Sequence, residues 1–276
     1  MAYPNRAEFT KGHPKVFLNF SDVFKDIKVL GAGGFGETHL IEDVISKKKY
    51  ALKILFKADK NEFYREVLTL INLSKAPDCD RDIVCYYDHF ILNDKYCILT
   101  EFIDGVNLAT FDESEALSVN DIIRTGLWLL QVIYRLHKRG FAHNDINPGN
   151  IIVANRDLTL IDFGLSCFMG NNRYVKCKAD RLINKLYASP EQRNGQYFTD
   201  VNRYSKTSDI YAIGLLLYFL LTDQQPYELD KDNIVGPYND VRNKCLNTAL
   251  KSMLLINPDQ RADAKEGYKL LSKCLK

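Results

Sequence analysis

The first hundred residues alternate between short apolar runs and turn-forming residues, which is typical of β-strands joined by tight connections. One stretch departs from this pattern. Residues 61–74 repeat apolar side chains at helical spacing, and the repeat stops before Pro77. The strand candidates are residues 24–30, 38–43, 50–55, 83–92 and 96–103. The pattern therefore predicts a small β-rich region with one helix.

After residue 105 the pattern becomes helical. Residues 118–140 repeat apolar side chains every three or four positions, with Ser118 and Asp121 placed for a capping box and Gly140 after the end. The apolar run from Ile210 to Leu221 is too short to cross a membrane, so it predicts a buried helix and no membrane span. We therefore expect a larger, mostly helical lobe after the β-rich one, joined near residues 101–106, with a ligand site in the cleft between them.

Composition adds little to this picture. The chain is 46% hydrophobic and 26% charged, and 37 Lys and Arg against 35 Asp and Glu give a net charge of +2, so we expect no nucleic-acid partner. Seven cysteines, an odd number without a C-x-x-C pair, predict free thiols in a reducing cytoplasm. The first residues lack the apolar stretch of a signal peptide.

The first candidate for chemistry is a glycine cluster, GAGGFGET, flanked by two predicted strands. Glycine lets a turn approach phosphate oxygens and present N–H groups to them, although a glycine-rich hairpin without a ligand has the same pattern. The residues expected around the phosphates are Gly31, Gly33, Gly34, Phe35, Gly36 and Thr38.

Lys53 lies in the next predicted strand. A strand lysine usually points to solvent, so a functional role requires a carboxylate partner. Glu62 and Glu66 follow in the predicted helix, and Glu66 is preferred because it directly precedes the apolar face.

The stretch FAHNDINPGNII and the later LIDFG hold the other candidates. Asp145 can take a proton from a hydroxyl nucleophile, while Asn150 and Asp162 offer oxygen ligands to a metal. Each has a plain alternative as a turn residue. Together with the glycines and Lys53, their order favours a site for a metal and a nucleotide.

These motifs in this order resemble a eukaryotic-type protein kinase catalytic domain. The resemblance covers residues 24 to about 271 and includes HNDINPGN, DFG, SPE, TSDIYAIG and NPDQRADAKE. It implies a bilobal α+β fold: a small antiparallel sheet with one main helix, then a mostly α-helical lobe. The implied division is an extension at 1–23, an N-lobe at 24–103 and a C-lobe at 104–276.

The resemblance also implies roles. Lys53, held by Glu66, would contact the inner phosphates of ATP; Asn150 and Asp162 would bind Mg²⁺; Asp145 would take the proton of a protein hydroxyl. Asp209 would anchor the catalytic loop, Arg261 would pair with Glu191, and Leu70, Tyr86, His143 and Phe163 would form an internal column. The residues expected around adenine are Ala51, Thr100, Glu101, Ile103 and Ile152.

Three positions depart from the family pattern. Asn144 replaces the usual Arg before the catalytic Asp, which implies activity independent of phosphorylation in the loop that follows. Asn147 replaces the Lys of serine/threonine kinases, and Asn184 stands where a Thr is usual. Tyrosine kinases typically have an Ala or Arg in the catalytic loop instead, so the sequence matches neither signature, and the acceptor prediction leans toward Ser/Thr. Two alternatives remain open: a small-molecule kinase of the choline or aminoglycoside type, and a pseudokinase that binds nucleotide without transfer.

The loop from Leu165 to Tyr187 is basic. Its charged residues are Arg173, Lys176, Lys178, Arg181 and Lys185 against Asp180. A solvated loop is one interpretation; attraction to acidic or already phosphorylated protein substrates is the other. This loop is also the proposed replacement for the missing cation at Asn147.

Overall fold

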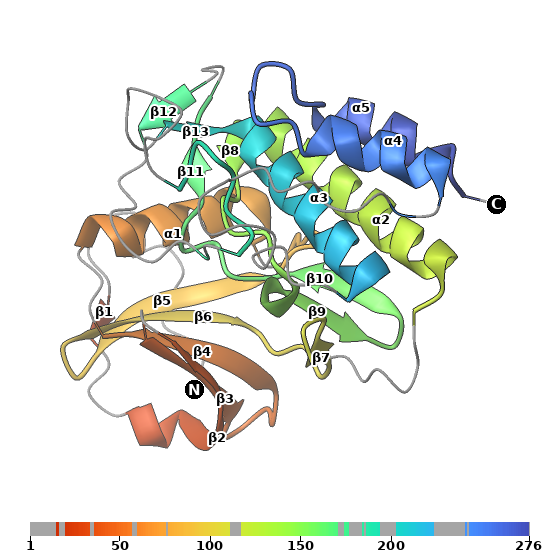
Figure 1. Ribbon diagram of the computed structural model, residues 1–276. Coiled ribbons are helices and arrows are strands. Elements are labelled where there is room, and N and C mark those ends of the chain that lie inside the picture. Colours follow the sequence, from red (N-terminus) through yellow and green to blue (C-terminus); the bar gives the residue numbers. More distant parts are fainter. Residues whose placement is uncertain are drawn as a thin grey trace. The chain divides into compact units, whose positions relative to one another are not determined.

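The computed structural model describes most of the chain and divides it into two compact units, Met1–Ile103 and Asp104–Lys276 (Figure 1). Each unit is described by itself. The described residues are 15–16, 20–33, 36–56, 60–75, 77–110, 117–170, 174–176, 184, 186–193, 203–223, 241 and 243–275.

The first unit is a β-sheet with one main helix, as predicted, but the sheet has six strands and not the five candidates of the sequence. The strands lie in the order β1-β5-β6-β4-β3-β2, and all neighbours are antiparallel except β1 and β5. The elements are β1 (Lys15–Val16), η2 (Phe20–Asp22), β2 (Phe24–Gly33), β3 (Gly36–Asp43), β4 (Lys49–Leu55), α1 (Lys60–Leu73), β5 (Tyr86–Leu92) and β6 (Lys95–Glu101).

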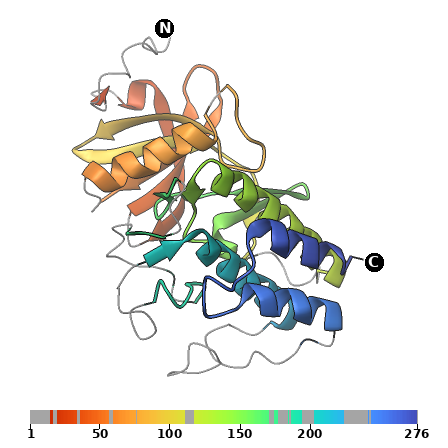
Figure 2. The same ribbon diagram turned by 90° about the horizontal axis from the view of Figure 1, so that it is seen from above.

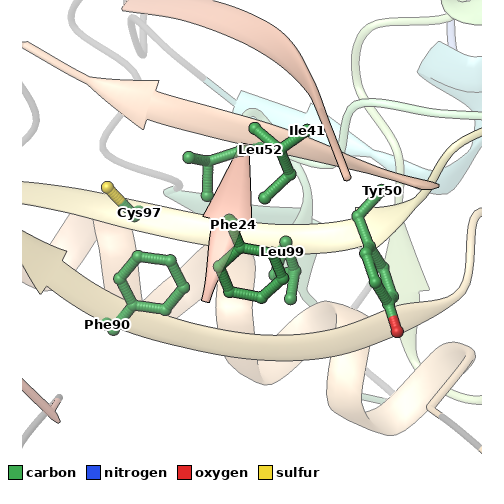
Figure 3. Close-up of a cluster of buried hydrophobic side chains, with 7 residues drawn as sticks. All are labelled: Phe24, Ile41, Tyr50, Leu52, Phe90, Cys97 and Leu99. Atoms are coloured by element: carbon green, nitrogen blue, oxygen red, sulfur yellow. The ribbon is translucent and has the colours of Figure 1, made fainter. Parts of the chain in front are cut away.

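One face of this sheet carries a buried hydrophobic cluster (Figure 3). Its members are Phe24, Ile41, Tyr50, Leu52, Phe90, Cys97 and Leu99. Phe20 packs against the cluster, with its ring centroid 5.3 Å from that of Phe24 and 6.1 Å from that of Phe90. Together with the pairing of β1 to β5, this contact ties residues before position 24 to the sheet.

The second unit is mostly helical. Helix α2 (Val119–Lys138) packs against α3 (Lys206–Thr222) and α5 (Ala264–Ser272), while α4 (Lys244–Met253) packs against α3 and α5 (Figures 1 and 2). The small sheets are β10-β9-β7, β11-β8 and β12-β13. Their strands, with one 3-10 turn, are β7 (Val106–Asn107), β8 (Phe141–Ala142), η4 (Pro148–Asn150), β9 (Ile151–Ala154), β10 (Asp157–Leu160), β11 (Cys167–Phe168), β12 (Tyr174–Lys176) and β13 (Arg203–Ser205).

The two long helices form for the reasons that the sequence indicates. The predicted capping box of α2 is present: the Ser118 hydroxyl accepts a hydrogen bond from the Asp121 N–H, and the Asp121 carboxylate accepts one from the Ser118 N–H. Helix α3 is apolar on all sides and is buried from Ser208 to Tyr218. Within the described part of the chain, no helix is long and apolar enough to cross a membrane.

The cysteines correct one expectation. The disulfide-bonded cysteines are Cys79 with Cys85, Cys245 with Cys274, and Cys167. The prediction of free thiols is therefore wrong for these residues. Among the described cysteines, it is confirmed for the buried Cys97. The physical reason is packing: α4 and α5 lie together and bring Cys245 within 5.5 Å of Cys274, Cα to Cα, although 29 residues separate them.

Candidate active site

Strand register brings the predicted phosphate-contacting residues into one row of the first unit. Gly31 pairs with Thr38 across β2 and β3, and Thr38 pairs with Lys53 across β3 and β4. Gly33 pairs with Gly36 at the end of the hairpin. The other two predicted residues, Gly34 and Phe35, lie outside the described residues.

The glycines of this hairpin differ in whether the surrounding structure has room for a side chain. A Cβ at Gly36 would collide with the Ile54 carbonyl oxygen, and its φ of +158° also disfavours a side chain. A Cβ at Gly31 or Gly33 would meet no atom within 4 Å. Packing within the sheet thus explains Gly36 but leaves Gly31 and Gly33 facing open space, which suits the approach of a ligand.

Lys53 and Glu66 form a short ion pair. The Lys53 Nζ lies 2.7 Å from the Glu66 Oε1, and the side chains are 21% and 6% exposed. The preference for Glu66 as the partner of Lys53 is therefore confirmed. In this arrangement the carboxylate fixes an ammonium group that keeps some access to solvent.

The predicted adenine-contacting residues of this unit lie at the end of β6 and beside it. Ala51 pairs with Thr100 across β4 and β6. The Glu101 N–H donates to the Cys85 carbonyl at 2.9 Å, and the Glu101 carboxylate accepts from the Cys85 N–H at 2.7 Å. Burial raises the pKa of this carboxyl group. Because the Glu101 N–H is already bonded to Cys85, the main-chain carbonyl of Glu101 is the candidate group for a contact with the edge of adenine. Ile103 follows two residues later and is partly buried.

In the second unit, two amides hold the carboxylate of Asp145. The Asn150 Nδ2 donates to the Asp145 Oδ2 at 2.8 Å and to the Asp145 carbonyl at 2.9 Å. The Asn147 Nδ2 donates to the Asp145 Oδ1 at 3.2 Å. Because the Asn150 amide nitrogen is used in this way, its amide oxygen is the group left to bind a cation.

Asn147 thus has a structural role in the loop, which its sequence position did not indicate. Its amide oxygen accepts from the Gly149 N–H at 2.9 Å, so both ends of the side chain stabilise the loop around Asp145. The cation proposed to replace a lysine here lies in the basic loop, whose charged side chains are outside the described residues.

Asp209 anchors the loop that carries Asp145, as predicted. Its Oδ2 accepts from the His143 N–H at 2.9 Å and its Oδ1 from the Asn144 N–H at 2.7 Å. His137, which the sequence analysis did not identify, contacts the same carboxylate through its Nε2 at 2.9 Å. A buried carboxylate with three partners is well satisfied and rigid.

His143 links the loop to the strand that precedes DFG. Its ring lies edge-to-face against Phe163 at 4.8 Å, which confirms that part of the expected column. Its Nδ1 accepts from the Asp145 N–H at 3.2 Å, and its Nε2 lies 3.3 Å from the Ile161 carbonyl. The other two expected members, Leu70 and Tyr86, are buried in the first unit.

The environment of His143 predicts a pH effect on stability. Burial lowers the pKa of His143, and this outweighs the nearby charges of Asp209 and Asp162. Because the unfolded chain takes up a proton below about pH 6.5 and the folded chain resists it, stability is present above that pH and is lost as the pH falls. We expect His143→Gln to remove this loss, which is at most about 1.4 kcal/mol per pH unit.

Urea unfolding of both proteins at about pH 7 and about pH 5.5 measures this difference. Contributions from the other histidines are common to the two proteins and cancel. An equal loss of stability on acidification in both proteins would contradict the assignment.

Asp162 follows β10 after one residue, Ile161. The Ile161 N–H donates to the Asn150 carbonyl at 2.9 Å, which joins the two segments. Asp162 has a φ of +58°, a strained conformation that suits a residue held for function, and its Oδ1 accepts from the Gly164 N–H. Ile152 lies on the adjoining β9, paired with Thr159 of β10.

The oxygen atoms that Asn150 and Asp162 offer fit the ligand preference of magnesium. Mg²⁺ is usually bound through one or two carboxylates together with substrate phosphates and water, not through an all-protein cage. One carboxylate and one amide oxygen meet that requirement. Within the described ranges, no group of three or more His, Cys, Asp or Glu side chains is placed to hold a metal ion.

A buried ion pair lies next in sequence to a residue that contacts the Asp145 loop. Arg261 binds Glu191 through two contacts, Nη1 to Oε1 at 2.6 Å and Nη2 to Oε2 at 2.9 Å, as predicted. Gln192, the next residue, donates to the Asn144 carbonyl at 3.2 Å. Sequence reasoning missed Gln192, because only its position after SPE could have drawn attention to it.

The fold and these constellations define a protein kinase, and the comparison with known families agrees. The model of the protein kinase domain family matches residues 24–276, so the chain belongs to that family.

Curated relatives point to the same class. The chain is 29% identical over 209 residues to serine/threonine-protein kinase PrkC of Bacillus subtilis, covering 74% of this chain and 31% of the relative. It is 29% identical over 237 residues to calcium-dependent protein kinase 4 of Plasmodium berghei, covering 79% and 42%. For the probable serine/threonine-protein kinase PknB of Lactococcus lactis, the identity is 28% over 250 residues, covering 87% and 37%. The chain thus spans less than half the length of these relatives.

Proposed function

We propose that this kinase domain transfers the γ-phosphoryl group of Mg-ATP to a serine or threonine hydroxyl of a protein. The observation that carries the proposal is the Asp145 carboxylate, held by two amides in a loop that Asp209 anchors. A carboxylate fixed in this way is suited to orient a hydroxyl and take its proton. The names of the curated relatives support the Ser/Thr assignment.

Each residue has a role that follows from its charge. Lys53, fixed by Glu66, contacts the inner phosphates, and the N–H groups around Gly31 and Gly33 approach the phosphate oxygens. Asn150 and Asp162 hold the metal through oxygen atoms. Bound Mg²⁺ supplies positive charge that neutralises the phosphate oxygens.

The adenine contacts are proposed from the membership of the chain in the protein kinase family. The Glu101 carbonyl and the Ile103 main chain meet the polar edge of the base. Ala51 and Ile152 pack against its two faces, and Thr100 borders the pocket.

The proposal is tested by incubating the protein with γ-labelled ATP and Mg²⁺, with acidic and basic protein substrates, beside an Asp145→Ala control. The expected result is label on serine or threonine that the control lacks. Nucleotide binding without transfer would instead support a pseudokinase. Label on a small alcohol such as choline or an aminoglycoside would support a small-molecule kinase.

The two kinds of glycine predict different mutant phenotypes. Gly31→Ala should fold like the wild type, because its Cβ meets open space, but bind Mg-ATP about tenfold more weakly because the phosphates lose a close approach. Gly36→Ala should instead destabilise the first unit by about 1–3 kcal/mol, because its Cβ collides with the Ile54 carbonyl. Calorimetric titration with Mg-ATP and thermal unfolding separate the two effects. Equal nucleotide affinity of Gly31→Ala and wild type would argue against a phosphate loop.

The basic loop supports a proposal about substrates. Five basic residues against one acidic residue between 165 and 187 favour acidic or already phosphorylated protein segments. A matched pair of peptides, with Glu or with Gln around the same serine, tests this proposal. A higher kcat/KM for the Glu peptide, declining with added salt, is expected. Equal values would leave the loop as a solvated surface.

A further inference from the structure

The peptide group that precedes Asp145 is held from both sides by buried side chains. Its carbonyl, from Asn144, accepts a hydrogen bond from the Gln192 Nε2 at 3.2 Å. Its N–H, from Asp145, donates to the His143 Nδ1 at 3.2 Å. Because a peptide group is planar, hydrogen bonds at its carbonyl and at its N–H together restrain its rotation. These two side chains therefore fix the orientation of the backbone at Asp145.

The orientation of the Gln192 amide is determined by its other end. Its Oε1 accepts from the Ser189 N–H at 2.9 Å and from the Ser189 hydroxyl at 3.0 Å. Both residues are buried, with 3% of Gln192 and 0% of Ser189 exposed. Because two donors face the oxygen, the amide nitrogen must face the Asn144 carbonyl.

Asn144 is the residue that needs such support. Its φ of +66° is unusual for a residue other than glycine and persists where the surroundings fix it. Its N–H donates to Asp209, and its side-chain Nδ2 donates to the Leu165 carbonyl at 3.1 Å. One residue of the catalytic loop is therefore bonded both to Leu165, directly after DFG, and to Gln192, directly after SPE.

We propose that Gln192 is a positioning residue for Asp145, and that its bond to Asn144 couples the end of the segment 165–192 to the catalytic loop without a phosphate group. The inference rests on the proposed function. The uncharged Asn144 makes neutral hydrogen bonds at both ends of this segment. Small displacements of a reacting group lower transfer strongly, since about 1 Å can cost a hundredfold in rate.

The test compares Gln192→Met, which keeps the length of the side chain but cannot donate to Asn144, with Ser189→Ala. The latter removes the hydroxyl donor to the Gln192 Oε1 but keeps the Ser189 N–H donor at 2.9 Å, so the Gln192 amide nitrogen still faces the Asn144 carbonyl. For each protein, kcat is expressed per molecule that binds Mg-ATP, which discounts misfolded protein. We expect Gln192→Met to lower this kcat about 10–100-fold with the KM for ATP within about twofold. Ser189→Ala should stay within about threefold of the wild type.

A readout that does not depend on transfer accompanies the kinetics. Amide hydrogen exchange across residues 143–147 should be at least about tenfold faster in Gln192→Met than in Ser189→Ala or the wild type. Unchanged exchange, or an unchanged kcat in a transferring enzyme, would overturn the inference. A wild-type protein that binds Mg-ATP without transfer would refute the proposed function, while the exchange rates would still decide whether Gln192 fixes the loop.

Discussion

Replacing Arg261 by methionine is expected to lower the thermal unfolding midpoint by on the order of 10 °C. Arg261 and Glu191 are 0% and 1% exposed at their side chains, and their closest contact is 2.6 Å. In the variant, Glu191 would remain buried with the Ser208 hydroxyl at 2.7 Å but without a counter-charge. Removing one partner of such a pair costs about 3–5 kcal/mol, and each kcal/mol lowers the midpoint by about 2–4 °C in a domain of this size.

Circular dichroism during heating measures the effect, and Arg124→Met is the matched control. Arg124 contacts Asp121 at 3.3 Å on α2, but its side chain is 63% exposed, so its loss should change stability by less than about 0.5 kcal/mol. Adding Glu191→Gln to Arg261→Met should recover part of the loss, because no buried charge then lacks a partner. A midpoint of Arg261→Met within about 1 °C of the wild type would rule out this account.

Lys53→Met is expected to lower kcat/KM for phosphoryl transfer by about 10²–10³ while the protein stays folded. Methionine keeps the length of the side chain and removes the charge proposed to contact the phosphates. It also leaves Glu66, which is 6% exposed at its side chain, without the ammonium group 2.7 Å away. Steady-state kinetics with a peptide substrate, together with thermal unfolding, separate lost chemistry from lost fold.

Two variants complete this experiment. Lys47→Met removes the same charge from the same unit, but Lys47 is 69% exposed and lies 3.7 Å from Glu42, so activity should be unchanged. Glu66→Gln keeps the charge of Lys53 and loses only its fixation, so the decrease should be smaller than for Lys53→Met. If Lys53→Met retained more than about a third of the wild-type kcat/KM, the role proposed for Lys53 would be wrong.

Much of the fold follows from local patterns. Helix α2 was predictable because its apolar spacing and its capping residues, Ser118 and Asp121, lie within one short stretch. The pairing of Lys53 with Glu66 was predictable because helical spacing places that glutamate at the edge of the buried face of α1.

Features that depend on distant packing were not predictable. The parallel pairing of β1 with β5 joins Lys15 to Phe90, and no local signal marks it. The Cys245–Cys274 disulfide depends on how α4 and α5 pack, and the cysteine spacing alone suggested free thiols. Likewise, the family pattern drew attention to the positive charge that Asn147 lacks. Its hydrogen bonds within the Asp145 loop could be seen only in the structure.

Cys97, a member of the cluster in Figure 3, provides a chemical probe for opening of the first unit. The side chain is 0% exposed, and burial raises the pKa of its thiol to about 12. The thiolate is the form of cysteine that attacks alkylating reagents, so the folded unit protects this sulfur both by excluding the reagent and by keeping the proton on it. When opening and closing are fast relative to alkylation, the rate at which iodoacetamide modifies Cys97 therefore measures the fraction of molecules in which this cluster is exposed.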